Sequence, residues 1–323
     1  MHESATLRAL FAAALVLGGT AAARAERLTI PEGAHICIIG GGVADAMQHT
    51  GWLETLLHAR FPKHRLVIRN LAYDGDEIDP AKRLRNADFG TPDQWLAGAA
   101  PIPKPGDLTT KDHVRENRFE LAGTRADVIF AFFGSNEAHA GPEGLSAFKS
   151  QVEAFISHTL AQKYNGVAAP KLVMFTPIAH EDLGRPHWPD GKAHNADLAP
   201  YARAMQEACQ AAGVECVDLF APSLEAYAKE KENLTDDGIH PNERGDRVIS
   251  GIIDESLFGA APARDPKSLG RLRQAVADKN FHWFHRYRAT DGYSVYGGRS
   301  WLKFSPDQQS NYEVGQRELE YLD

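Results

Sequence analysis

An aspartate and a histidine three residues apart are the side chains of this sequence best suited to chemistry. Asp237 and His240 stand in the run Leu-Thr-Asp-Asp-Gly-Ile-His-Pro-Asn, residues 234–242. A short turn of this spacing brings a carboxylate within hydrogen-bond reach of an imidazole, which the carboxylate then orients for proton transfer. Asp-x-x-His alone is a weak motif, but its place in a loop before an expected helix strengthens it. The neighbouring Asp236 is interpreted as surface charge.

Two upstream segments carry groups that could stabilise negative charge. Residues 70–76 include Gly75, and residues 133–137 include Asn136. A backbone N–H at a glycine and a side-chain amide are donors that stabilise a developing oxyanion by about 3–4 kcal/mol each. The alternatives are that Gly75 only forms a turn and that Asn136 only caps the following helix. The order of the segments along the chain favours the functional interpretation.

Three consecutive glycines, 40–42, follow the apolar run 36–39. Such a turn at the start of a helix exposes N–H groups that bind anions or sugar oxygens. Asp45 follows within the expected helix. It is interpreted either as a general acid or hydrogen-bonding group of the site, or as an exposed helix residue, and the residues alone leave both open.

Strand-like apolar runs alternate with helix-like segments along the chain. Strands are expected at 35–39, 66–71, 128–133, 171–178 and 214–219. Helices are expected at 51–61, 145–160, 197–212 and 242–258. This alternation predicts an α/β fold with a parallel sheet covered by helices on both faces. All the segments with candidate chemistry follow strand ends, where such sheets bind ligands.

In order and spacing, these segments resemble the conserved blocks of the SGNH (GDSL-like) hydrolase superfamily. The resemblance implies a three-layer α/β/α, flavodoxin-like fold. It also implies that His240 is a general base oriented by Asp237, and that Gly75 and Asn136 are oxyanion-hole donors. No cofactor and no metal are implied.

The resemblance leaves one gap, because the family's first block carries Gly-Asp-Ser and its serine attacks an ester. Here Gly41 stands in the place of the aspartate and Gly42 in the place of the serine. Glycine has no side chain that can attack. The expected reaction is therefore a single displacement in which His240 activates a water, with the glycine turn binding the substrate.

The run 40–49, the run 51–57 and the tail Phe-His-Trp-Phe-His-Arg-Tyr-Arg are similar to a divergent SGNH-like group of Planctomycetes that lacks this serine. Those bacteria secrete many carbohydrate-degrading proteins, so the resemblance implies a carbohydrate substrate and cleavage of an ester or glycosidic bond. A glycosidic reaction would need a carboxylate such as Asp45 facing the dyad across the substrate. The alternative is a non-catalytic glycan-binding pseudoenzyme that kept the cleft, although an oriented base favours catalysis.

The tail also carries side chains that suit a sugar or carboxylate ligand. His285, Arg286, Arg288 and Tyr293 are interpreted as substrate-binding residues, since Arg is rarely buried unless it is paired. The aromatic residues among them, Trp283 above all, would instead dock the tail onto the main domain. His282 and His285 complete no recognised metal site.

Composition and the chain ends bound the remaining possibilities. The 323 residues are 43% hydrophobic and carry a net charge of −8 without a long basic run, which argues against nucleic acid as a partner. Residues 1–25 are expected to be a signal peptide, which predicts a periplasmic or secreted protein without a further membrane span. A hydrolase domain is expected at 26–260, interrupted at about 79–125 by an insertion that is either a flap or a surface loop. Residues 261–323 form a C-terminal extension.

Overall fold

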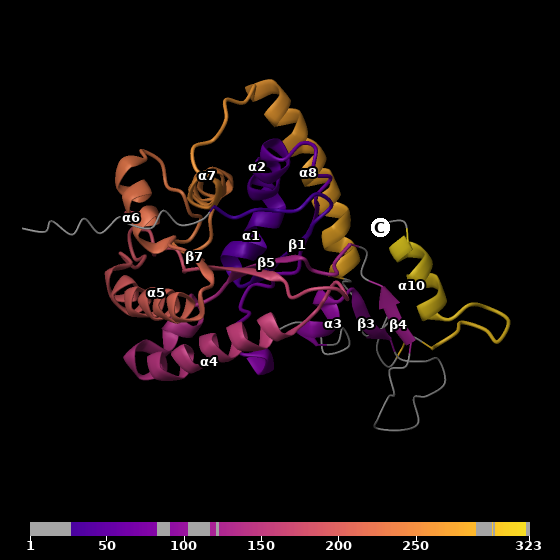
Figure 1. Cartoon of the computed structure of the whole chain (residues 1–323). Helices are drawn as coiled ribbons and strands as arrows, with labels where there is room; N and C mark the ends of the chain where they lie inside the picture. Colours follow the sequence, from indigo (N-terminus) through magenta and orange to yellow (C-terminus); the bar gives the residue numbers. More distant parts are fainter. Residues whose placement is uncertain are drawn as a thin grey trace, which may run out of the picture.

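The computed structural model describes residues 27–82, 91–102, 117–120, 123–288, 299 and 301–320. A five-stranded sheet lies at its centre in the order β2-β1-β5-β6-β7, and every neighbouring pair of its strands is parallel (Figure 1). The strands are β1 (His35–Gly40), β2 (Val67–Asn70), β5 (Val128–Phe132), β6 (Lys171–Phe175) and β7 (Glu215–Val217). Each lies at a strand expected from the sequence. The continuous apolar run of β5 is buried along its whole length, as expected for a strand covered on both faces.

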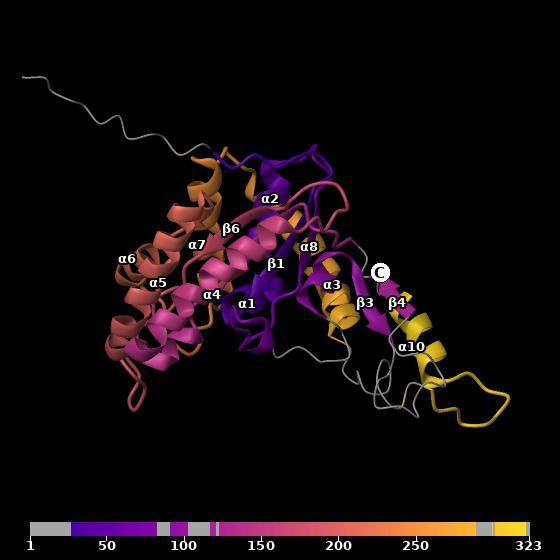
Figure 2. The ribbon, with the colours of Figure 1, turned by 60° about the horizontal axis from the view of Figure 1, so that its bottom comes forward.

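Helices cover both faces of the sheet, as Figures 1 and 2 show. One layer consists of α1 (Gly42–Thr50), α2 (Trp52–Arg60) and α7 (Glu243–Phe258), and the other is built mainly from α4 (Gly141–Ala161) and α5 (Lys192–Ala212). Alternate residues of each strand enter opposite cores. Ile36 and Ile38 pack with the first layer, and Cys37 and Ile39 with the second. The three-layer α/β/α architecture predicted from the sequence is confirmed.

Two elements on the α5 side depart from the sequence prediction. Helix α5 begins at Lys192, before the expected start at 197. Its first turn is polar and has no apolar periodicity, so the sequence pattern did not indicate it. The chain enters this helix through Gly191, whose φ of 73° is in the left-handed region. The short helix α6 (Phe220–Lys229) follows β7 directly and was not expected.

The C-terminal extension begins with a long helix, α8 (Pro266–Tyr287), capped by the side chain of Asp265 on the N–H of Ser268 at 2.9 Å. In Figure 1 it runs beside α1 and α2, at the edge of the sheet formed by β2. Side chains of α8 donate hydrogen bonds to backbone carbonyls at this edge. The bonds are Lys279 Nζ to Ile68 at 3.0 Å, Trp283 Nε1 to Asn70 at 2.7 Å, and Tyr287 OH to Leu71.

Residues at spacings of four lie on one face of a helix, so a single stripe of α8 reaches the edge strand. An unpaired strand edge is a template for unwanted strand pairing, and covering it with a helix removes that hazard. The carbonyls that a sixth strand would have used are bonded to this helix instead.

The insertion expected at about 79–125 is described in part. Its described elements are a 3-10 turn η1 (Pro80–Lys82), the short helix α3 (Pro92–Leu96), and an antiparallel pair, β3 (Ala99–Ile102) with β4 (Asn117–Glu120). Trp95 and Leu96 of α3 are buried in the core beneath α4 and α5. In both views β3 and β4 lie with the last helix, α10 (Asn311–Glu320), beyond α8 (Figures 1 and 2). Among the described residues, no helix has the length and apolar character needed to span a bilayer.

Candidate active site

The Asp237–His240 pair lies in the loop between α6 and α7. The Nδ1–H of His240 donates to Oδ2 of Asp237 at 2.6 Å. The other carboxylate oxygen accepts the backbone N–H groups of His240 at 2.8 Å and Ile239 at 3.0 Å. The aspartate therefore fixes both the loop and the ring, and the Nε2 atom of the ring points away from it. This is the oriented imidazole that proton transfer requires.

A buried glutamate holds the first half of this loop in place. Glu181, in the segment after β6, accepts the backbone N–H groups of Leu234 at 3.0 Å and Thr235 at 2.7 Å. It also accepts the Thr235 hydroxyl at 2.6 Å. Sequence reasoning gave this residue no role, and no local motif marks it. By fixing the loop backbone, it fixes the position of the dyad.

The surroundings of the dyad alter the pKa values of both members. Burial alone would lower the pKa of His240, but the Asp237 carboxylate and then Asp74 outweigh it and raise that pKa above its ordinary value. Burial alone would raise the pKa of Asp237, but the hydrogen bonds from His240 and Ile239 bring it below its ordinary value. Each partner thus favours the charged form of the other.

Gly42, the residue in the place of the family's serine, faces the imidazole of His240 directly. It is the first residue of α1, after the N-cap Gly41. A Cβ atom added to Gly42 would come within 2.6 Å of Cδ2 of His240 and 2.7 Å of Oδ1 of Asp74. The space that a side chain at position 42 needs is therefore occupied by the histidine ring and a carboxylate.

Asp74 is a part of this site that the sequence did not reveal. Its Oδ1 lies 3.3 Å from Nε2 of His240, and its side chain is 57% exposed. The residue belongs to the candidate segment 70–76 and directly precedes Gly75, so its neighbourhood was expected at the site. Its contact with His240 could not be predicted, because the two residues are far apart in the sequence.

Asn136 lies on the other side of the glycine turn. Its Nδ2 donates to the backbone carbonyl of Asp76 at 3.3 Å, and a Cβ added to Gly41 would lie 3.4 Å from the same Nδ2. The Asn136 side chain makes no capping hydrogen bond to the 3-10 helix η3 (Glu137–Ala140), although it occupies the N-cap position. The structure therefore does not show Asn136 capping this helix with its side chain. The amide lies beside Gly41 instead.

A narrow crevice of about 20 Å³, enough for a water, lies beside Asn136 and the glycine turn. Gly75 comes directly before Asp76, in a turn where the N–H of Asp76 donates to the carbonyl of Tyr73 at 3.0 Å. Its φ is 87°. Gly41 and Gly42 line the crevice and Gly42 faces His240, so the crevice adjoins the dyad. The lining residues are Gly41, Gly42, Val43, Asp76, Phe132, Phe133, Ser135, Asn136, Glu137, Thr176 and Pro177.

Glu137 is a second structural carboxylate that the sequence did not single out. It is buried and accepts the N–H of Ile78 at 2.7 Å and the N–H of Gly134 at 2.8 Å. These bonds join the loop after β5 to the loop after β2. They fix the distance between the Asn136 and Gly75 segments.

Asp45 and Arg288 are each other's partners. They form a salt bridge, and Asp45 also accepts from Gln48 at 2.6 Å. Burial raises the pKa of Asp45 above its ordinary value, while Arg288 opposes that shift. Arg288 further donates to the carbonyl of Ala72 at 2.7 Å and lies 3.7 Å from the ring centre of Tyr73. Both side chains thus support the turn before Asp74, and the structure shows neither facing the dyad.

The other expected substrate-binding residues of the tail are not gathered at the dyad. Arg286 is only 2% exposed, which does not match a substrate-contacting side chain, because α8 turns this position toward the core. His285 is half-buried on α8, where its Nδ1 bonds the carbonyl of Phe281 at 2.8 Å. Tyr293 lies outside the described residues. Trp283 docks α8 onto the main domain, as the alternative interpretation of the aromatic residues expected.

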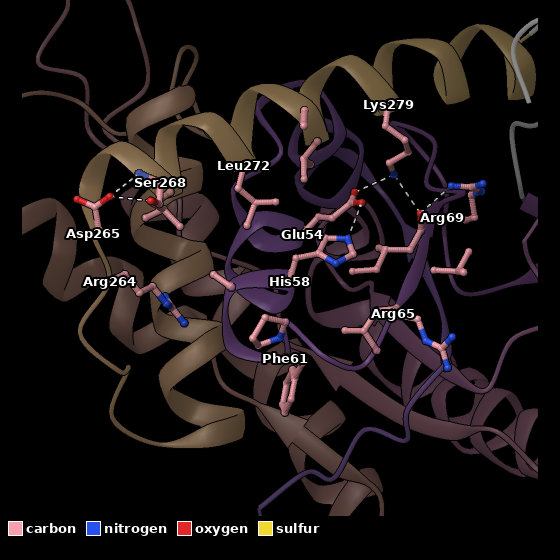
Figure 3. A pocket seen from close by; sticks show the side chains of 18 of the residues that line it. Glu54, His58, Phe61, Arg65, Arg69, Arg264, Asp265, Ser268, Leu272 and Lys279 are labelled. Atoms are coloured by element: carbon pink, nitrogen blue, oxygen red, sulfur yellow. Dashed lines mark hydrogen bonds and ion pairs between the residues drawn. The ribbon is translucent and has the colours of Figure 1, made fainter.

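A larger cavity of about 760 Å³ lies between α2, the start of β2 and α8 (Figure 3). None of the candidate catalytic residues lines it. Lys279 and His58 point toward the Glu54 carboxylate in its wall, at 2.9 and 3.3 Å. The Glu54 carboxylate is thus engaged by two basic side chains of the same wall. Within the described part of the chain, no three His, Cys, Asp or Glu side chains gather in a way that could hold a metal ion.

Comparisons with known proteins identify the family and the fold. The sequence matches the GDSL-like Lipase/Acylhydrolase family over residues 30–248. No curated protein matches the sequence. Among solved structures, a catalytic mutant of Axe2, an acetylxylan esterase from Geobacillus stearothermophilus, is similar with a TM-score of 0.51 and 12% identity, over 74% of this chain and 100% of that one. LAE5, an alpha/beta hydrolase enzyme from the metagenome of Lake Arreo, Spain, has a TM-score of 0.48 and 18% identity, over 72% of this chain and 99% of that one.

Proposed function

The chain belongs to the GDSL-like lipase/acylhydrolase family, a group of SGNH hydrolases, and we propose that it hydrolyses an ester on a carbohydrate without a serine nucleophile. The observation that carries the proposal is the position of Gly42 against His240. The family's oriented imidazole is kept, yet the neighbouring position offers no hydroxyl. A water in front of the dyad is then the attacking group, and no covalent acyl-enzyme forms.

The crevice supplies what the attack on an ester needs. As the water adds to the carbonyl carbon, negative charge develops on the carbonyl oxygen. The amide of Asn136 and the N–H groups of Gly75 and the glycine turn are the donors proposed to stabilise it. The proton of the water passes to a base beside His240. The small size of the crevice, about 20 Å³, favours a short acyl group such as acetyl over a long one.

A carbohydrate is favoured as the alcohol part of the ester. The acetylxylan esterase has the same fold, and an exposed tryptophan stands beside the catalytic loop of this chain. Trp188 is 45% exposed, and the guanidinium carbon of Arg185 lies 5.3 Å from its ring centre. Arg185 in turn donates to the carbonyl of Asp236 at 3.2 Å. Aromatic rings with a polar neighbour are common in small-molecule sites, and a sugar ring can stack on such a face.

Cleavage of an ester is favoured over cleavage of a glycosidic bond. A glycosidase would need a second carboxylate across the substrate, and Asp45 is engaged by Arg288 instead. The second candidate function is a glycan-binding protein without catalysis, which the absence of the serine favours. Retention of the oriented dyad argues for the enzyme. We further propose a periplasmic or secreted location, from the signal-like segment at residues 1–25, which precedes the described part of the chain.

The proposal is tested by incubating the protein without residues 1–25 and its His240→Ala variant with acetylated and unacetylated plant and algal glycans. Mass spectrometry identifies every released product. Acetate that the variant does not release would support the esterase, whereas released free sugar would assign a glycosidic bond. Retention of glycan by both proteins with no product from either would instead support the binding protein.

A further inference from the structure

The carboxylate of Asp74 occupies the position beside the dyad where the family's nucleophile would act. Its Oδ1 is 3.3 Å from Nε2 of His240 and would be 2.7 Å from a Cβ on Gly42. Within the described residues, the hydrogen bond given to this carboxylate is the one from His240. The side chain is 57% exposed, so water reaches it.

The contact also favours the charged form of the ring. Both nitrogens of His240 lie against carboxylate oxygens, Nδ1 on Asp237 and Nε2 on Asp74. An ionised carboxylate accepts hydrogen bonds and does not donate them, so with both carboxylates ionised each nitrogen carries the proton of its hydrogen bond. In this imidazolium form the ring is an acid, and another group takes the first proton from the attacking water.

We propose that Asp74 is the general base of this enzyme and that the His240 imidazolium is its general acid. The inference rests on the proposed ester hydrolysis and assigns His240 a role opposite to the one that the family resemblance implies. Asp74 takes one proton from the water as the water oxygen bonds to the carbonyl carbon. His240 Nε2 then gives its proton to the leaving sugar oxygen as the carbon–oxygen bond breaks.

The cycle closes across the contact between the two residues. The proton held by Asp74 returns to Nε2 of His240, which restores the carboxylate and the imidazolium. Ester and water have become acid and alcohol, and the product acid releases its proton to solvent. No electron transfer and no covalent intermediate with the protein are required.

The neighbouring carboxylates do not fit the role. Asp45 is bound to Arg288, and Asp237 is occupied by the ring and two backbone N–H groups. Asp76 lines the crevice but is only 2% exposed. Among these residues, Asp74 combines contact with Nε2 of His240 and access to water.

The test compares acetate release by the wild type, Asp74→Asn and Asp278→Asn. Asp278 is an exposed residue of α8 and does not belong to the site, so its variant is the matched control. General acid–base catalysis contributes about 10²–10⁴-fold, and we expect Asp74→Asn to lower kcat by at least about 100-fold. KM should change by less than about threefold, because the lost interaction acts in the transition state.

A second variant separates chemistry from folding. Asp74→Ala should regain part of its activity when sodium formate supplies the missing carboxylate, a response that a purely structural role would not give. Asp74→Asn with kcat within about threefold of the wild type would overturn the assignment and leave His240 as the base. A wild type that releases no acetate from any substrate would overturn the proposed function, and the role of Asp74 with it. The two failures are thus distinguished by the wild type alone.

Discussion

Gly42 and His240 stand so close that a side chain at position 42 would force the imidazole or the Asp74 carboxylate to shift. A Cβ on Gly42 would lie 2.6 Å from Cδ2 of the ring. The ring itself is held by Asp237 at 2.6 Å. The chain has therefore not merely lost a serine from an otherwise unchanged site. Its histidine, together with Asp74, fills the place that the serine would require.

Restoring the serine should for this reason impair the enzyme. Gly42→Ser must displace His240 or Asp74, and displacements near 1 Å from productive geometry can cost about 100-fold in rate. We expect kcat/KM for acetate release to fall by about that factor. Gly251→Ser is the control, since a Cβ there meets no atom within 4 Å. An active Gly42→Ser enzyme with a burst of acyl-enzyme formation would show that the site still accepts the family's mechanism.

The kcat of the reaction should decrease on the alkaline side of its pH profile. Neighbouring carboxylates raise the pKa of His240 above its ordinary 6.5, so the imidazolium persists to higher pH. As pH rises through the raised pKa, the ring loses the proton that the leaving group needs, and kcat should decrease. If His240 acted as the base, kcat would rise over the same interval. Background hydrolysis is measured with His240→Ala and subtracted.

The same pKa is accessible by NMR titration of the His240 ring, assigned by comparison with His240→Ala. We expect a midpoint above 6.5 in the wild type and a lower midpoint in Asp74→Asn, because one of the two stabilising carboxylates is gone. A midpoint unchanged by Asp74→Asn would show that Asp74 does not interact with the ring in solution.

Helix α8 should contribute to stability through its contact with β2. Trp283 is buried and bonded to the carbonyl of Asn70 at 2.7 Å. Its replacement by Ala creates a cavity and leaves that carbonyl unpaired, for an expected loss of about 3–5 kcal/mol in the free energy of unfolding. Phe281→Ala on the same helix, at a residue 59% exposed, should change it by less than about 0.5 kcal/mol. Denaturant unfolding that shows equal stability for both variants would contradict the docking of α8.

Trp188 should matter for sugar substrates more than for small esters. Aromatic contacts contribute about 0.5–1.5 kcal/mol, so Trp188→Ala should raise KM for acetylated oligosaccharides by up to about tenfold. KM for a small aryl acetate should stay unchanged. Phe304→Ala, at a highly exposed aromatic residue of the C-terminal extension, is the control. Equal effects on both substrates would remove Trp188 from the proposed sugar site.

The sequence was sufficient to predict the sheet and the segments that meet at its edge. Continuous apolar runs such as Val128–Phe132 identify buried strands, and the loops after them converge because parallel strands end on one side. The pairing of Asp237 with His240 is local, so its spacing alone suggested it.

Contacts between distant positions were not predictable in this way. Asp74 meets His240 across 166 positions, and no motif near either residue encodes that distance. The two arginines of the tail stand at the end of α8, Arg286 in its last turn and Arg288 at its C-cap. Arg286 turns inward, whereas Arg288 reaches Asp45. Which face is buried depends on how α8 meets β2, and the sequence of the tail does not specify this.

The central claim is hydrolysis that depends on His240 and on no serine. It is tested most directly by measuring acetate release from an acetylated oligosaccharide before and after treatment with a fluorophosphonate, which modifies catalytic serines. We predict that the treated wild type keeps its full rate and carries no label, while His240→Ala releases no acetate. Loss of activity together with a labelled serine in the wild type would contradict the claim.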